Sequence, residues 1–83
     1  MSDEIAFAVK NFILEEFLPG EDPADLTMET PLITGGILDS IATLKLVMFL
    51  EDSWRIKIAA HEVSPDNLDT IALIANLVRS KQT

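Results

Sequence analysis

The stretch Gly35-Gly36-Ile37-Leu38-Asp39-Ser40-Ile41 lies in the middle of the chain, where a long loop-like segment ends and an apolar helical pattern begins. Two adjacent glycines permit turn conformations that cost other residues energy. Asp39 and Ser40 both belong to the residue types that favour the N-cap of a helix. The stretch therefore predicts a turn followed by a helix that begins at about residue 40.

Ser40 would then stand at a helix N-terminus, where unpaired N–H groups and the positive end of the helix dipole favour a phosphate group. A serine in this position can carry a phosphoryl ester. The alternative is that Asp39 and Ser40 do no more than cap the helix. The rest of the sequence has to decide between these two interpretations.

Length, composition and charge narrow the class of protein. The 83 residues predict a single domain spanning residues 1–83, which is too small for a deep active-site cleft. The chain contains no cysteine, its first residues are acidic, and no apolar run reaches membrane-spanning length. We therefore expect a monomeric cytoplasmic protein without disulfide bonds, secretory signal or transmembrane helix. Its net charge of −8 disfavours nucleic acid and anionic membranes and favours basic protein partners, although solubility alone also explains the charge.

Apolar spacing predicts an all-α fold, a four-helix bundle with three longer helices and one short third helix. We expect helices at residues 3–17, 40–54, 65–68 and 70–80, with Asp69 capping the last one. Residues 18–38 form a long connection whose apolar side chains predict a structured loop between the first two helices. Residues 55–58 alternate like a strand, but no partner strand is evident, so we predict an extended connection. The expected buried stripes are Ile5, Ala8, Val9, Phe12 and Ile13 in the first helix, Ala42, Leu46, Phe49, Leu50 and Trp54 in the second, and Leu68, Ile71, Ile74, Ala75 and Val78 at the end.

The second helix has an unusual outward face. At 100° per residue, Ile41, Lys45, Met48 and Asp52 line up opposite the buried stripe. Ile41 and Met48 could form a small apolar strip for a partner protein. Met48 could equally lie under the long loop.

Residues for catalysis or metal binding are scarce. His61 is the one histidine and is expected in an exposed connection, and the chain has neither cysteine nor a calcium-binding loop pattern. The adjacent carboxylates Glu15-Glu16 and Glu51-Asp52 are expected on solvated helix faces, where they are poor acid–base pairs. We predict no catalytic residues and no metal site. A helical domain with one well-presented serine is best explained if another enzyme modifies that serine.

Several motifs occur in a characteristic order: Thr30-Pro31-Leu32, then Gly36 to Ile41, then Leu46 to Asp52, then Ile56-Lys57-Ile58, then Ser64-Pro65-Asp66-Asn67-Leu68-Asp69-Thr70-Ile71. With these motifs nearly the whole chain resembles the acyl carrier and peptidyl carrier protein family. The resemblance implies a 4′-phosphopantetheine arm on Ser40, with Asp39 as the acidic neighbour of that serine. It also implies a phosphopantetheinyl transferase that takes the arm from coenzyme A with a divalent metal. The arm's thiol would hold an acyl or aminoacyl group as a thioester.

The resemblance further implies a loading ligase and a downstream acyl transferase or synthase as partners, and it implies no catalysis by the carrier itself. Ala42 and Lys45 stand where carriers of fatty-acid synthesis tend to have acidic residues. This difference favours a free-standing carrier of a specialised pathway, a group that includes D-alanine and other aminoacyl carriers. The alternative function is an unmodified acidic helical domain that binds other proteins, in which Ser40 only caps a helix.

Overall fold

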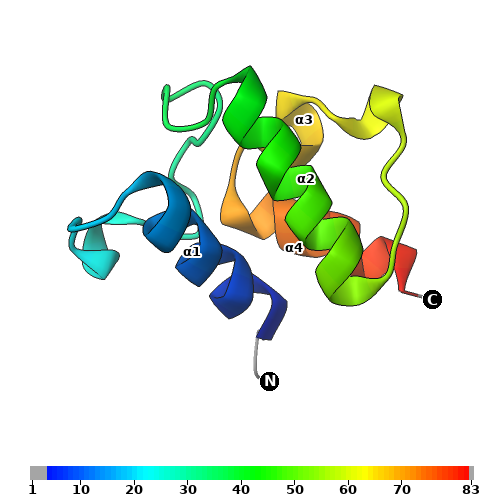
Figure 1. Cartoon of the computed structure of the whole chain (residues 1–83), viewed down its shortest axis with the longest axis horizontal. Coiled ribbons are helices and arrows are strands. Elements are labelled where there is room, and N and C mark those ends of the chain that lie inside the picture. The colour runs from blue at the N-terminus through cyan, green and yellow to red at the C-terminus, as the bar shows by residue number, and fades with distance from the viewer. Residues whose placement is uncertain (1–3, 83) are drawn as a thin grey trace.

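The computed structural model describes residues 4–82, which contain four α-helices and two short 3₁₀ helices (Figure 1). The α-helices are α1 (Glu4–Phe17), α2 (Ser40–Trp54), α3 (Pro65–Leu68) and α4 (Ile71–Lys81), and the 3₁₀ helices are η1 (Pro23–Asp25) and η2 (Ala60–Glu62). Helix α1 packs against α4 and α2, and α3 packs against α4. The expected all-helical fold is confirmed, with α2 at its expected bounds, whereas the expected start of the first helix at residue 3 lies outside the described residues.

The core lies between α1, α2 and α4 and contains most of the predicted apolar residues. The side chains with essentially no solvent exposure include Ile13, Leu46, Leu50, Leu68, Ile71 and Ile74. In α1 the buried residues are Ala6, Val9 and Ile13, so the predicted stripe is displaced toward Ala6. Phe12, which the stripe included, is half-buried, and its ring stacks on that of Phe49 in α2 with centroids 4.1 Å apart. Half-buried Phe17 and Trp54 extend this aromatic cluster through edge-on contacts.

The long connection between α1 and α2 is a structured layer, as predicted. Leu26, Leu32 and Leu38 are buried in the same core as the helices. The N–H of Leu32 donates to the carbonyl of Asp69 at 2.6 Å, which ties the middle of the connection to the α3–α4 junction. The connection thus reaches α2 as a packed segment.

Asp69 has a different role from the one predicted. Its carboxylate accepts hydrogen bonds from the N–H groups of Ile33 (2.8 Å) and Thr34 (2.9 Å) and from the Thr34 hydroxyl (2.8 Å). These bonds, first among them that from the Thr34 N–H, lower the pKa of Asp69. Thr70 caps α4 instead, because its hydroxyl oxygen accepts from the N–H of Leu73. Asp69 therefore holds the long connection in place.

The connection from α2 to α3 is also anchored by carboxylates. Glu51 is half-buried and accepts a hydrogen bond from the N–H of Ile58 at 2.9 Å, so its predicted solvated position is wrong. Glu62 pairs with Lys81 at the end of α4, and this hydrogen bond is the main reason that the pKa of Glu62 is lowered. Among residues 4–82, no helix has both the length and the apolar character needed to cross a membrane.

Candidate functional site at the start of helix α2

Asp39 caps α2. Its backbone is extended, and its Oδ1 atom accepts a hydrogen bond from the N–H of Ala42 at 2.7 Å. Its carbonyl oxygen accepts from both the N–H and the hydroxyl of Thr43, at 2.9 and 2.7 Å. The first turn of the helix is therefore closed by Asp39 without help from its neighbour.

Ser40 is the first residue of α2 and its side chain is exposed. Within residues 4–82 its hydroxyl makes no hydrogen bond, and the N–H groups of Ser40 and Ile41 also donate to no described residue. The interpretation that Ser40 serves as the helix cap is therefore wrong. The structure leaves this hydroxyl free beside two open N–H donors.

The two glycines shape the turn that leads to Ser40. Gly36 has a φ of +83°, which side chains rarely adopt, and a Cβ on Gly35 would overlap the carbonyl oxygen of Pro31. The N–H groups of Ile37 and Leu38 both donate to the carbonyl of Leu32, at 2.8 and 2.9 Å. Since Leu32 is fully buried, this turn fixes the direction in which the chain enters α2.

A groove lies beside Ser40, between the start of α2 and the segment that leads into α3. It encloses about 550 Å³. Its lining is mainly apolar and consists of Ile33, Leu38, Asp39, Ser40, Thr43, Leu44, Val63, Ser64 and Pro65. No local sequence pattern indicated this groove, because its two walls are distant in the chain.

The outward face of α2 is apolar near Ser40. Ile41 is 67% exposed and Met48 is 65% exposed, so the alternative that placed Met48 under the loop is wrong. Leu44 is 58% exposed and belongs to the same face, which the sequence interpretation missed. Its spacing of three from Ile41 and four from Met48 is the signal that could have identified it.

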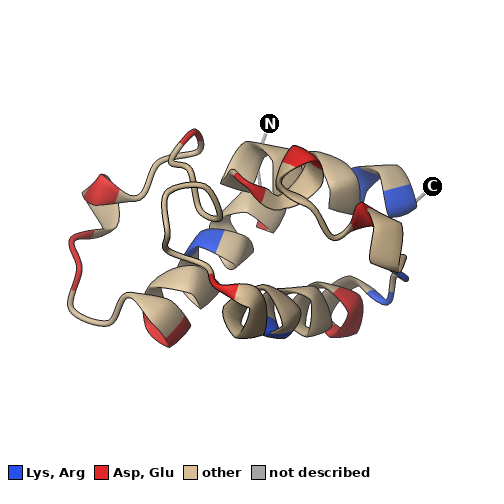
Figure 2. Cartoon of the chain, turned by 90° about the horizontal axis from the view of Figure 1, so that it is seen from above, with Lys and Arg blue, Asp and Glu red and all other residues tan. Residues whose placement is uncertain are grey.

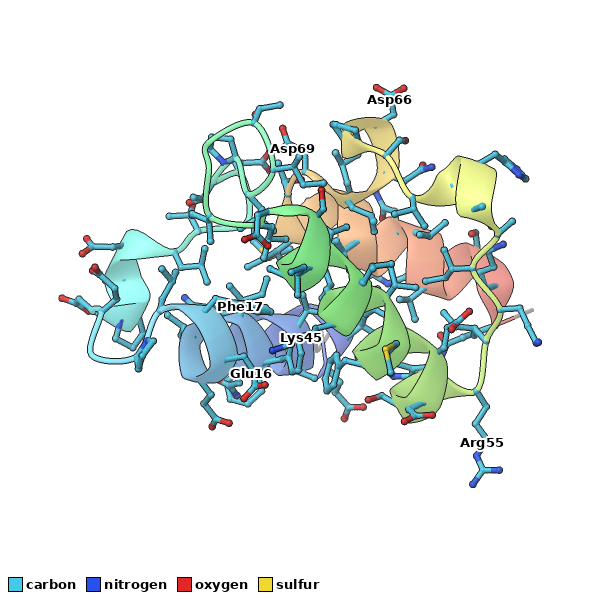
Figure 3. The ribbon with its side chains drawn as sticks, turned by 45° about the horizontal axis from the view of Figure 1, so that its top comes forward. Glu16, Phe17, Lys45, Arg55, Asp66 and Asp69 are labelled. Carbon is cyan, nitrogen blue, oxygen red and sulfur yellow. The ribbon has the colours of Figure 1, made fainter. Side chains whose placement is uncertain are left out.

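Lys45 and Asp52 are exposed as predicted, whereas Ala42 is buried against the core and is no part of the outward face. Lys45 extends toward the end of α1, where Glu16 and Phe17 lie (Figure 3). Phe17 and Lys45 line a shallow hollow of about 210 Å³. Lys45 is the one basic residue of α2, and it lies at the edge of the apolar face formed by Ile41, Leu44 and Met48.

Among the described residues, no histidine lines the groove beside Ser40. Residues 4–82 contain no cluster of three or more histidine, cysteine, aspartate or glutamate side chains that could hold a metal ion. His61 is exposed on η2, as expected, and gives the Ser40 hydroxyl no hydrogen bond. Within residues 4–82, the Ser40 hydroxyl has no hydrogen bond to any side chain that could act as a base.

Comparison with known proteins identifies the family. The chain is 36% identical over 69 residues to the Serratia protein named "Probable acyl carrier protein PigG", a match that covers 83% of this chain and 78% of the relative. The chain belongs to the acyl carrier protein family. This carrier is also 32% identical over 62 residues to the D-alanyl carrier protein of Streptococcus pyogenes, covering 75% of the chain and 77% of that protein.

A third relative is much longer than the carrier. The lincomycin biosynthesis protein LmbN of Streptomyces lincolnensis is 36% identical over 66 residues, which make up 80% of this chain but 24% of LmbN. No family model matches the chain. The family resemblance and the carrier function inferred from the sequence are confirmed by PigG and the D-alanyl carrier protein, of which the matches cover 78% and 77%.

Proposed function

We propose that residues 1–83 form one carrier domain that holds an acyl or aminoacyl group as a thioester on a 4′-phosphopantetheine arm attached to Ser40. The observation that carries this proposal is the exposed Ser40 hydroxyl, which has no hydrogen-bond partner among the described residues. When bound, the arm supplies a terminal thiol, which this cysteine-free chain lacks. The carrier's own residues have to present the hydroxyl, hold the phosphate and guide the arm.

The helix start suits a phosphodiester on Ser40. The open N–H groups of Ser40 and Ile41 lie in the first turn of α2, at the positive end of the helix dipole, where a negative charge is favourable. Because Asp39 already closes the first turn, esterification of the Ser40 hydroxyl breaks no hydrogen bond within residues 4–82. The residues at this site therefore fit the group.

Asp39 is suited to a second task during attachment. Its Oδ1 atom is engaged by the helix cap, whereas its Oδ2 atom accepts no hydrogen bond from residues 4–82. We propose that Oδ2 contributes to binding the divalent metal that accompanies coenzyme A on a phosphopantetheinyl transferase. In that reaction the Ser40 oxygen would form a bond to the phosphorus that carries pantetheine, and the bond from this phosphorus to the oxygen bridging the two phosphates of coenzyme A would break. Adenosine 3′,5′-bisphosphate would leave, and the Ser40 proton would pass to a base of the transferase.

The apolar groove beside Ser40 offers a resting place for the arm. Leu38, Leu44 and Val63 give it apolar walls, which suit an uncharged pantetheine chain better than a charged one. The face formed by Ile41, Leu44, Lys45 and Met48, with Asp52 at its far end, is the surface we propose for partner enzymes. These partners are a loading ligase and a downstream acyl transferase or synthase.

The relatives favour a specialised pathway. One relative is named for lincomycin biosynthesis and another for carrying D-alanine, and the first half of α2 has Lys45 as its sole charge. Like charges across an interface cost several kcal/mol, so Lys45 disfavours partners with basic docking surfaces. We infer an acyl or aminoacyl cargo outside general fatty-acid synthesis.

The test is intact-protein mass spectrometry after incubation with coenzyme A, magnesium and a permissive phosphopantetheinyl transferase. We expect the wild-type protein and the Ser53→Ala variant to gain one phosphopantetheinyl group and Ser40→Ala to gain none. Ser53 is a matched control because it is an exposed serine near the other end of α2. A folded wild-type protein that gains no mass with several transferases would refute the proposal. Modification that persists in Ser40→Ala would refute the assignment of the residue.

A further inference from the structure

A second cavity, the loop cavity, shares no lining residue with the groove. It is lined by seven residues, Leu14, Leu18, Glu21, Asp22, Asp25, Leu26 and Ile37, and encloses about 230 Å³. Four of these residues are apolar, and three are exposed carboxylates from the turn after α1 and from η1. The cavity therefore has apolar walls and an acidic rim.

The rim carboxylates lie in a stretch of the sequence that contains no basic residue. No lysine, arginine or histidine occurs between Lys10 and Lys45, whereas seven carboxylates do: Glu15, Glu16, Glu21, Asp22, Asp25, Glu29 and Asp39. Figure 2 accordingly shows separate acidic segments and no basic segment on the connection between α1 and α2. Within residues 4–82, the rim carboxylates form no ion pair with Lys10 or any other side chain. Asp22 caps η1 through the N–H of Ala24, and Glu21 and Asp25 have no internal role of this kind.

We propose that the loop cavity binds an arginine side chain of a partner protein. The methylene stem of arginine packs on apolar walls while its guanidinium stays near water, which matches walls of leucine and isoleucine below a rim of carboxylates. Its five fixed N–H donors can serve two carboxylates at once, whereas the compact ammonium of lysine is held by water more strongly. An arginine anchor in such a pocket is a common source of binding energy at protein interfaces.

One wall of the loop cavity lies near Ser40 in the sequence. Ile37 contributes to its wall and stands three residues before Ser40, in the turn that the Leu32 carbonyl holds. A partner anchored there would contact residues of α1 and of the long connection that do not line the groove. The rim of the loop cavity is negative, whereas Lys45 on α2 is positive. A partner that contacts both the loop cavity and the outward face of α2 must therefore present an arginine to the cavity and no basic patch to α2.

The test titrates the unmodified carrier with n-butylguanidinium as the probe. Binding is monitored by two-dimensional ¹H–¹⁵N NMR at low ionic strength. We expect saturable shift changes confined to the residues of the loop cavity. Binding should weaken roughly fivefold to tenfold in the double variant Glu21→Gln/Asp25→Asn, because two exposed charge pairs are removed. The matched double variant Glu15→Gln/Glu16→Gln removes the same charge from the exposed end of α1 and should bind almost as the wild type does.

Two further probes make the test specific. The neutral n-butylurea should not bind, and n-pentylammonium should bind more weakly than n-butylguanidinium. The site would be overturned if the shift changes failed to saturate, spread over all acidic residues or persisted with n-butylurea. The choice of arginine would be overturned if n-pentylammonium bound as tightly as n-butylguanidinium. Since Ser40→Ala should bind the probe normally, this result is independent of whether Ser40 is modified.

Discussion

Replacing Gly35 by alanine should disrupt the turn before Ser40 far more than replacing Gly36. A Cβ at position 35 would overlap the carbonyl oxygen of Pro31 and also meet its carbonyl carbon at 3.2 Å and its Cγ at 3.3 Å. At position 36 a Cβ meets no atom within 4 Å, so the strain there comes only from the φ of +83°. The two neighbouring glycines thus have different physical reasons to be glycine.

The magnitudes follow from these two causes. At Gly36, an alanine with positive φ costs about 1–2 kcal/mol, and the stiffer unfolded chain returns roughly 0.4–1 kcal/mol of this, so we expect a net loss of about 1 kcal/mol. At Gly35 the turn itself must shift, which endangers the bonds from the N–H groups of Ile37 and Leu38 to Leu32 and from Leu32 to Asp69. Loss of two or three such bonds costs about 2–3 kcal/mol. A domain of this size has a total stability of about 4–12 kcal/mol, so both variants should remain folded.

Urea unfolding at constant protein concentration measures the difference directly. Gly20→Ala is the matched control, because Gly20 has a φ of +88° and open space around it but lies far from Ser40 in the chain. We expect Gly36→Ala and Gly20→Ala to lose similar stability and Gly35→Ala to lose at least about 1 kcal/mol more. The phosphopantetheinylation rate should fall in Gly35→Ala and hold in Gly20→Ala. If the free energy of unfolding of Gly35→Ala lies within about 0.5 kcal/mol of the control, the reasoning about this turn is wrong.

Three further predictions concern the cap, the core and acid stability. Ser40→Ala should change the free energy of unfolding by less than about 0.5 kcal/mol, whereas Asp39→Ala should lower it by about 1 kcal/mol because Asp39 supplies the cap. Equal losses of the two variants in urea unfolding would contradict this. Leu46→Ala should lower the free energy of unfolding by about 3 kcal/mol because Leu46 is fully buried. Leu44→Ala should leave the free energy of unfolding nearly unchanged and should instead weaken partner binding, because Leu44 is exposed. A large loss of stability in Leu44→Ala would refute the exposed face. The pKa of Asp69 is lowered in the folded state, so its carboxylate stabilises the fold at pH values above its ordinary pKa of about 4, and this stabilisation disappears as the pH falls through the folded-state pKa. The thermal unfolding temperature of Asp69→Asn should therefore depend less on pH in acid than that of the wild type. Parallel curves of unfolding temperature against pH for the two proteins would rule this out.

Local patterns in the sequence were sufficient for the helices. The bounds of α2 follow from the glycines and Asp39 before it and from the apolar spacing within it, and these signals act over a few residues. The outward positions of Ile41 and Met48 follow from the same periodicity. The loop with buried leucines was predictable because so many apolar residues could not all remain in water.

Tertiary contacts decided what the polar residues do. Asp39 and Ser40 are both good cap residues, and only the geometry shows that Asp39 takes the cap and leaves the Ser40 hydroxyl free. Asp69 finds its partners at residues 33 and 34, too distant in the chain for any local pattern to reveal. The groove and the loop cavity likewise join segments far apart in sequence, because a pocket exists only where packed elements leave space between them.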